Sequence, residues 1–120
     1  MTVKRISTGK AGEEAAVQHI RKKGMRVLER NFRCRLGELD IIARDGRYIV
    51  FVEVRTSNST AFGTPQESVG AKKKQKLRLL AQYYIKIRNL GDVPLRFDVV
   101  AVTGVPGGGI IKIEHIANAF

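Results

Sequence analysis

Two stretches near the middle of the chain carry its densest apolar pattern. Residues 37–44 and 47–55 alternate in the manner of strands, and Asp45-Gly46 between them is typical of a two-residue hairpin turn. Shorter runs with the same character, bounded by turn residues, predict further strands. These lie at 26–33, 96–103 and 110–116.

Helical periodicity appears in two other places. From about Gly12 to Lys23, apolar residues recur every three to four positions, and from about Ala71 to Asn89 they do so again. A glycine follows each stretch, as expected at a helix end. Residues 1–11 lack periodicity and predict a basic, mobile lead-in. The expected buried positions are Ala16, Val17 and Ile20 in the first helix and Leu77, Leu80, Ala81 and Tyr84 in the second.

The elements follow one another as αβββαββ, and no repeat or linker divides the 120 residues. This order predicts an α/β fold with a mixed central sheet of about five strands flanked by helices. With 43% hydrophobic and 28% charged residues, the composition is that of one globular domain spanning 1–120.

Acidic residues interrupt the apolar hairpin on one face. A turn at Asp45-Gly46 places Glu38 opposite Glu53 and Asp40 opposite Phe51. Asp40 and Glu53 are then diagonal neighbours about 7–8 Å apart, a span that two carboxylates close around one divalent cation. The opposite face is wholly apolar and holds Leu39, Ile41, Ala43, Tyr48, Val50, Val52 and Val54.

A carboxylate in a core strand needs compensation, because burying an unpaired charge is costly. A metal ion bound by Asp40 and Glu53 supplies it, and the alternative is a buried ion pair with Arg55 or Lys73. Glu13 points along the apolar face of the first helix, either toward this site or as an acid stabilising the helix N-terminus. Asp98 is expected to be a structural hydrogen-bonding group.

The net charge of +11 and a pI near 10.3 favour a polyanionic partner. Nucleic acid is the leading interpretation, and a solvated basic surface is the alternative. Basic residues flank the acidic ones, before the hairpin and at the start of the second helix, where they oppose the helix dipole. The predicted nucleic-acid contacts are Arg33, Arg35, Lys72, Lys73, Lys74 and Lys76.

Other chemistries have little support. Cys34 is the single cysteine, and His19 and His115 form no metal or nucleophile pattern with it. The tyrosines and phenylalanines read mostly as core, so base stacking is weakly supported. No apolar run reaches the roughly 20 residues of a membrane span, and the expected location is the cytoplasm.

The pattern of Asp40, twelve residues, then Glu53-Val54-Arg55, preceded by Glu13 on a helix, resembles the PD-(D/E)XK, or restriction-endonuclease-like, nucleases. Nearly the whole chain is similar to the small bacterial YraN-like family (UPF0102), which itself resembles archaeal four-way-junction resolvases. The segments that carry this similarity are Gly12-Glu13, Asn31, 37–42, 51–55, 62–65 and 96–100.

The resemblance implies a site for Mg²⁺ or Mn²⁺ formed by Asp40, Glu53, the carbonyl of Val54 and Glu13, with DNA as substrate. Arg55 stands where these nucleases usually have lysine. A guanidinium stays protonated, so it can clamp a phosphate but cannot exchange a proton with water. The sequence therefore leaves two functions open, an endonuclease and a nucleic-acid-binding module that has lost catalysis. Symmetric cutting of a junction would further require a homodimer.

Overall fold

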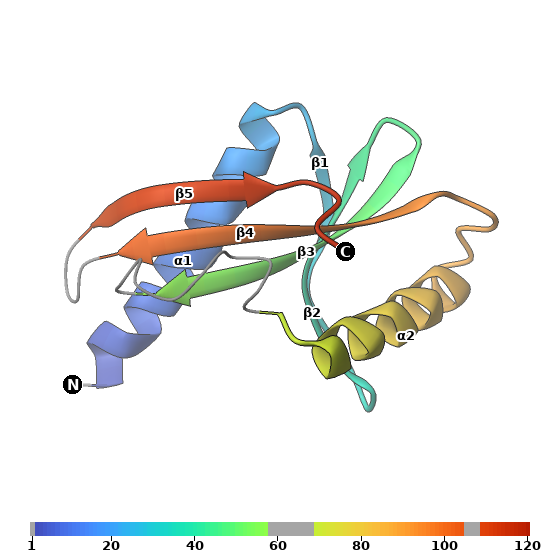
Figure 1. Cartoon of the computed structure of the whole chain (residues 1–120), viewed down its shortest axis with the longest axis horizontal. Coiled ribbons are helices and arrows are strands. Elements are labelled where there is room, and N and C mark those ends of the chain that lie inside the picture. The colour runs from blue at the N-terminus through green and yellow to red at the C-terminus, as the bar shows by residue number, and fades with distance from the viewer. Residues whose placement is uncertain (1, 58–68, 105–108) are drawn as a thin grey trace.

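The computed structural model describes residues 2–57, 69–104 and 109–120. Two helices and five strands follow the predicted order (Figure 1). Their bounds are α1 Thr2–Lys22, β1 Arg26–Cys34, β2 Gly37–Asp45, β3 Tyr48–Ser57, α2 Ala71–Ile87, β4 Leu95–Gly104 and β5 Ile110–Ile116. The predicted motif at 62–65 lies outside the described residues.

The five strands form one sheet in the order β1-β2-β3-β4-β5. The pairing between β3 and β4 is parallel, and the other neighbours are antiparallel. A parallel pair needs a long crossover connection, and α2 lies within it. The prediction of an α/β fold with a mixed sheet of the restriction-endonuclease-like type is confirmed.

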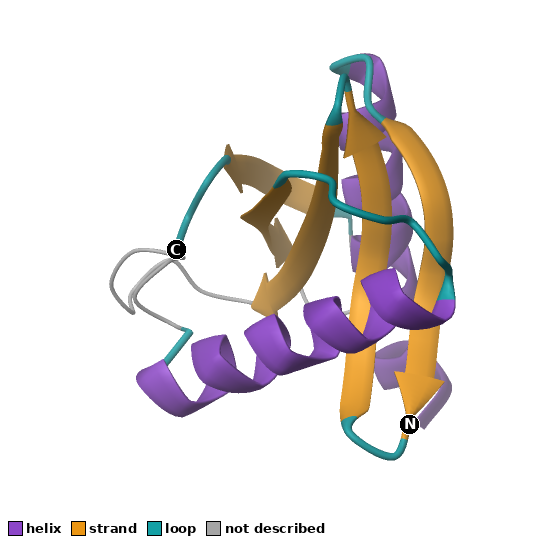
Figure 2. Cartoon of the chain, turned by 90° about the vertical axis from the view of Figure 1, so that its right-hand side faces the viewer, coloured by secondary structure: helices purple, strands orange, loops and turns teal. Residues whose placement is uncertain are grey.

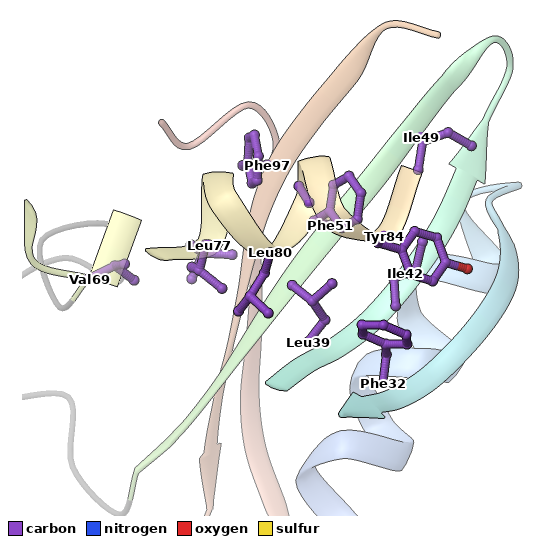
Figure 3. Packing of buried hydrophobic residues seen from close by; sticks show 12 residues of the cluster. Phe32, Leu39, Ile42, Ile49, Phe51, Val69, Leu77, Leu80, Tyr84 and Phe97 are labelled. Atoms are coloured by element: carbon purple, nitrogen blue, oxygen red, sulfur yellow. The ribbon is translucent and has the colours of Figure 1, made fainter. Parts of the chain in front are cut away.

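The helices cover opposite faces of the sheet (Figure 2). On one face, Ala16, Val17 and Ile20 of α1 pack against Ile41 and Val50. On the other, the buried side chains of α2 meet an aromatic-rich layer of the sheet (Figure 3). The predicted buried stripe of α2 is confirmed at all four positions, Leu77, Leu80, Ala81 and Tyr84.

The first helix begins earlier than predicted. Residues 1–11 were expected to form an aperiodic lead-in, but α1 starts at Thr2. No proline interrupts this stretch, and a helix that is already nucleated gains one hydrogen bond for each further residue. Apolar periodicity reveals the turns that pack against the core and says little about a helical extension beyond them.

The hairpin turn lies one residue further along than predicted. Asp45 pairs with Tyr48, so the two turn residues are Gly46 and Arg47. Gly46 has φ +60, and glycine at the first position of a two-residue turn is typical of type II′. The predicted register, with Asp40 opposite Phe51, is therefore wrong, because Ile42 takes that place.

The corrected register brings the two acidic residues closer together. Ile41 pairs with Val52, which sets Asp40 level with Glu53. Because the shift moves both strands by a residue, the acids keep their common face. Leu39 is an exception to the predicted faces, since it packs with Phe32 and the α2 side of the core.

Within the described residues, no helix has the length and apolar character required to cross a membrane.

Candidate functional site

A pocket of about 410 Å³ lies where the first turns of α2 meet β2 and β3. Its floor is acidic and its rim is basic. Leu77 and Leu80 of α2, labelled in Figure 3, form an apolar wall. The polar side chains that line it are Glu38, Asp40, Glu53, Arg55, Lys73 and Lys76.

Asp40 is fixed by the neighbouring strand. The backbone N–H of Val54 donates to Asp40 Oδ2 at 2.9 Å. Burial, with the charges of Glu53 and Glu38, outweighs this bond and raises the pKa of Asp40 to about 7. Near neutral pH, a cation that binds beside Asp40 would therefore displace the proton of this carboxyl into solvent.

Glu53 is nearly buried, with 6% of its side chain exposed, and two cations contact the same oxygen. Lys73 Nζ lies 3.2 Å from Glu53 Oε2, and Arg55 Nη1 lies 3.5 Å from it. Both ion-pair partners that the sequence left open as an alternative to metal are thus in place. Lys73 brings α2 to the acidic floor, whereas Arg55 comes from the same strand as Glu53.

Gly37 allows the helix to approach the start of β2. Its φ of +143 belongs to a region that favours glycine. A Cβ atom at this position would come within 3.2 Å of Leu80 Cδ1 and of Lys76 Cε. Glycine therefore permits the close contact that shapes one side of the pocket.

The other predicted basic contacts separate into groups. Lys76 lines the pocket beside Lys73, whereas Lys72 is exposed outside it. Lys74 Nζ lies 5.7 Å from the centre of the Phe120 ring. On the other side, Arg35 is exposed beyond β1, and Arg33 pairs with Glu38 at 3.4 Å. Glu38 is thus paired with an arginine of the preceding strand.

Glu13 is not among the residues that line the pocket. Its Oε1 atom accepts from Asn31 Nδ2 at 2.9 Å and lies 3.2 Å from Arg30 Nη2. Asn31 has φ +53, a conformation that asparagine tolerates better than most residues. Because α1 begins at Thr2, the alternative role for Glu13 at a helix N-terminus is wrong.

Comparison with known proteins identifies the family of this chain. The family model described as uncharacterised protein family UPF0102 matches residues 12–102. The chain belongs to this family. Among its UPF0102 relatives, the protein of Moorella thermoacetica is 49% identical over 120 residues, covering both chains completely. That of Pelotomaculum thermopropionicum is 47% identical over 112 residues, which is 93% of each chain.

The UPF0102 match contains the whole pocket, and the similarity to the YraN-like family is confirmed. A third UPF0102 protein, from Thermodesulfovibrio yellowstonii, is 47% identical over 116 residues, or 97% of each chain. The family description states no activity, so the chemistry has to be argued from the site itself.

The oxygen donors at the floor of the pocket fit Mg²⁺ or Mn²⁺. Among the described residues, no group of three or more acidic, histidine or cysteine side chains is arranged to hold a metal. Magnesium does not need three protein ligands of this kind, because it commonly binds one or two carboxylates, several waters and the phosphates of a substrate. Asp40 and Glu53 offer two carboxylates, and the carbonyl of Val54 is a further oxygen beside them. The donor set does not suit a closed zinc site.

A second polar cluster has a structural role, as predicted for Asp98. This side chain is fully buried and accepts from Arg96 Nε at 2.9 Å and from the backbone N–H of Asn118 at 2.9 Å. His115 Nε2 lies 2.7 Å from Asp98 Oδ2, and His115 Nδ1 lies 3.0 Å from Lys23 Nζ. Among the described residues, no buried side-chain nitrogen or oxygen lacks a hydrogen-bond partner, and Asp98 does not line the pocket.

Two features escaped sequence reasoning, one in the pocket and one on α2 outside it. Gly37 was taken as the start of a strand and as part of a family segment, although a glycine in a strand can also mark a close approach by another element. Tyr83 was counted with the core aromatic residues, yet it is 38% exposed on α2. Its position one residue before the buried Tyr84 is the signal that separates the two.

Proposed function

We propose that this protein is a Mg²⁺- or Mn²⁺-dependent endonuclease that hydrolyses phosphodiester bonds in DNA. The observation that carries the proposal is the pair of carboxylates, Asp40 and Glu53, at the floor of a pocket with a basic rim. An acidic pair attracts a divalent cation, and the lysines and arginine around it attract a phosphate.

Each residue then has a defined task. Asp40 and Glu53 hold the metal with the carbonyl of Val54, which lies between Glu53 and Arg55 on β3. When bound, the metal would lower the pKa of a water molecule and offset charge that develops on the phosphate. The N–H of Val54 keeps Asp40 oriented toward the site.

Arg55 and Lys73 serve as a two-sided clamp on the scissile phosphate. Both cations lie within 3.5 Å of Glu53 Oε2, on different elements. A phosphate entering between them would gain two charged contacts, which position the reacting atoms and stabilise the transition state. On this proposal the arginine binds and orients, and it does not serve as a base.

DNA is the proposed nucleic acid, in keeping with the resemblance to junction-resolving nucleases, and branched DNA is the preferred form to test. The charge of +11 supports binding through the phosphate backbone. Glu13 is left out of the proposed metal ligands, because Arg30 and Asn31 occupy its carboxylate.

A second candidate function is a nucleic-acid-binding module without catalysis. One observation favours it: Lys73 and Arg55 both pair with Glu53 and compensate its negative charge. A pocket compensated in this way could bind phosphate and need no metal. This candidate predicts salt-dependent binding that chelators leave unchanged.

The deciding experiment measures cleavage and binding together. Labelled single-stranded, duplex, flap and four-way-junction DNA are incubated with the protein and Mg²⁺, Mn²⁺ or EDTA. Asp40→Asn and Glu53→Gln proteins, prepared identically, control for contaminating nuclease.

Metal-dependent cutting that both variants lose, while their binding persists, is the expected result. Cutting that survives in either variant would contradict the assigned site. Tight, salt-sensitive binding without cutting under any metal would establish the second candidate.

A further inference from the structure

The outer face of α2 exposes an apolar stripe that the core does not use. Leu79, Tyr83 and Ile87 are 55%, 38% and 42% exposed. They stand four residues apart, so they share one side of the helix, next to the buried stripe that contains Leu80 and Tyr84. A row of three large apolar side chains on a surface helix indicates a binding surface more strongly than isolated ones do.

Cations stand at both ends of this stripe. Lys72 and Lys76 precede it at helical spacing, and Lys86 lies beside its last residue, Ile87. All three are exposed, and Lys76 also lines the pocket. The sequence of α2 contains no acidic residue. The stripe is thus continuous with the candidate site and carries positive charge along its length.

Tyr83 is held in a defined place on this surface. Its ring centre lies 6.5 Å from that of Phe32 on β1, at an interplanar angle of 46°. Phe32 is 6% exposed and belongs to the core. An aromatic ring supported from behind and open in front is a suitable platform for a nucleobase.

We propose that the outer face of α2 binds a single-stranded segment of the nucleic acid and leads it toward the pocket. Lys76 and Lys86 contact its phosphates, and a base stacks on Tyr83 between them. Lys76 and Lys86 are ten positions apart, which is about 15 Å along the helix and matches a short run of about two or three nucleotides. The inference rests on the proposed function, since it assumes a nucleic-acid substrate.

The positive charge of α2 favours nucleic acid over a second copy of the chain as the partner that binds this face. Pairing two copies through α2 would bring together two lysine-rich helices of a protein with a net charge of +11. Like charges across an interface are unfavourable. A duplex is disfavoured for another reason, because its bases are already stacked and present no free face to Tyr83.

The test compares a fluorescein-labelled single-stranded 12-mer of thymidylate with a labelled 12-base-pair duplex. Anisotropy is measured at one fixed salt concentration in EDTA, which excludes cleavage. Tyr83→Ala should weaken single-strand binding by about 5- to 150-fold, the range for loss of one stacked base. Duplex affinity should change less than twofold.

Two further variants sharpen the test. Tyr83→Phe keeps the ring and should bind like the wild type. When the titration is repeated at several salt concentrations, Lys86→Gln should lower the salt slope for the single strand by about one. Tyr48→Ala is the matched control. Tyr48 is also partly exposed, at 36%, but it follows the β2–β3 turn, at the end of the hairpin away from the pocket.

The outcomes separate this inference from the proposed function. If wild-type protein binds both DNAs and Tyr83→Ala weakens neither, or both equally, the stacking surface is wrong while the proposed function stands. If the wild type binds no nucleic acid, both proposals fail. If sedimentation shows a dimer that Tyr83→Ala dissociates, the stripe is a contact between copies and the inference is overturned.

Discussion

Lys73 Nζ lies 3.2 Å from Glu53 Oε2, joining the second helix to the central strand at the floor of the pocket. The two residues come from elements on either side of a long connection, yet they form the ion pair around which the other polar groups gather. Lys73 is half exposed and Glu53 is nearly buried. The lysine can therefore turn toward an entering phosphate, while the carboxylate stays where it is.

Loss of this lysine should impair catalysis more than binding. We expect Lys73→Met to lower kcat for the cleaved DNA by about 100- to 1,000-fold, the usual effect of removing one charge-stabilising donor. Binding in EDTA should weaken only slightly, because many other cations remain. Lys112→Met, an exposed lysine on the edge strand β5, is the control and should cut normally. Equal rates for both variants would remove Lys73 from the clamp.

The residue at position 55 separates clamping from proton transfer. We expect Arg55→Lys to retain cleavage within about tenfold and Arg55→Gln to lose about 100-fold, because the proposed role needs a positive charge. Single-turnover rates on the best DNA substrate provide the measurement. Cleavage that appears only in Arg55→Lys would show instead that the natural protein is a binding module.

Asp40 should make the fold less stable as pH rises. Its pKa is about 7 in the fold against an ordinary 3.8, so the folded state binds more protons between these values. Stability contributed by this group is then lost as pH increases from about 4 to about 7. Asp40→Asn, which can still accept from Val54, should melt several degrees above the wild type at pH 8 and close to it at pH 4. A less stable variant at pH 8 would contradict this account.

A divalent cation should reverse that loss. Bound to the folded state alone, Mg²⁺ or Mn²⁺ at ten times its Kd would add about 1.4 kcal/mol to the free energy of unfolding. We expect the melting temperature of the wild type to rise with either metal at pH 8. Asp40→Asn and Glu53→Gln should show no rise, and Glu114→Gln, on β5, should behave as the wild type does. An equal rise in all four proteins would place the cation elsewhere.

The buried network around Asp98 should matter for folding and not for chemistry. Asp98→Ala would leave Arg96 and His115 without their shared partner, and breaking such a buried set costs about 3–5 kcal/mol. The hydrogen bonds of His115 and Arg96 prevail over burial and lower the pKa of Asp98, so its contribution is lost on acidification. Urea unfolding at pH 7 tests the cost, with Asp92→Ala, an exposed acid, as the control. A loss below 1 kcal/mol would contradict the structural role.

Much of the fold follows from local patterns in the sequence. Period-two alternation located β2 and β3, and the helical stripe of α2 was correct at each buried position. The common face of Asp40 and Glu53 was also predictable, because a register shift that moves both strands preserves alternation. These features depend on neighbouring residues alone.

Features that depend on distant parts of the chain were harder to predict. The hairpin register turned on whether Gly46 took the first or second place in the turn, a difference of one residue with similar local preference. Glu13 pointed along the apolar face, but its partners Arg30 and Asn31 lie on another element. The contact of Lys73 with Glu53 depends on where the connection between β3 and β4 positions α2 on the sheet. No local sequence pattern predicts that position.

The parallel pairing of β3 with β4 has a consequence for how the protein is made. Glu53 stands opposite Val99 and Val54 opposite Val100, so the strand that carries the acids gains its second neighbour only from the last quarter of the chain. During translation, Asp40, Glu53 and Lys73 are all synthesised before that neighbour. A chain that lacks β4 therefore leaves β3, which carries Glu53, as an unpaired edge of the sheet.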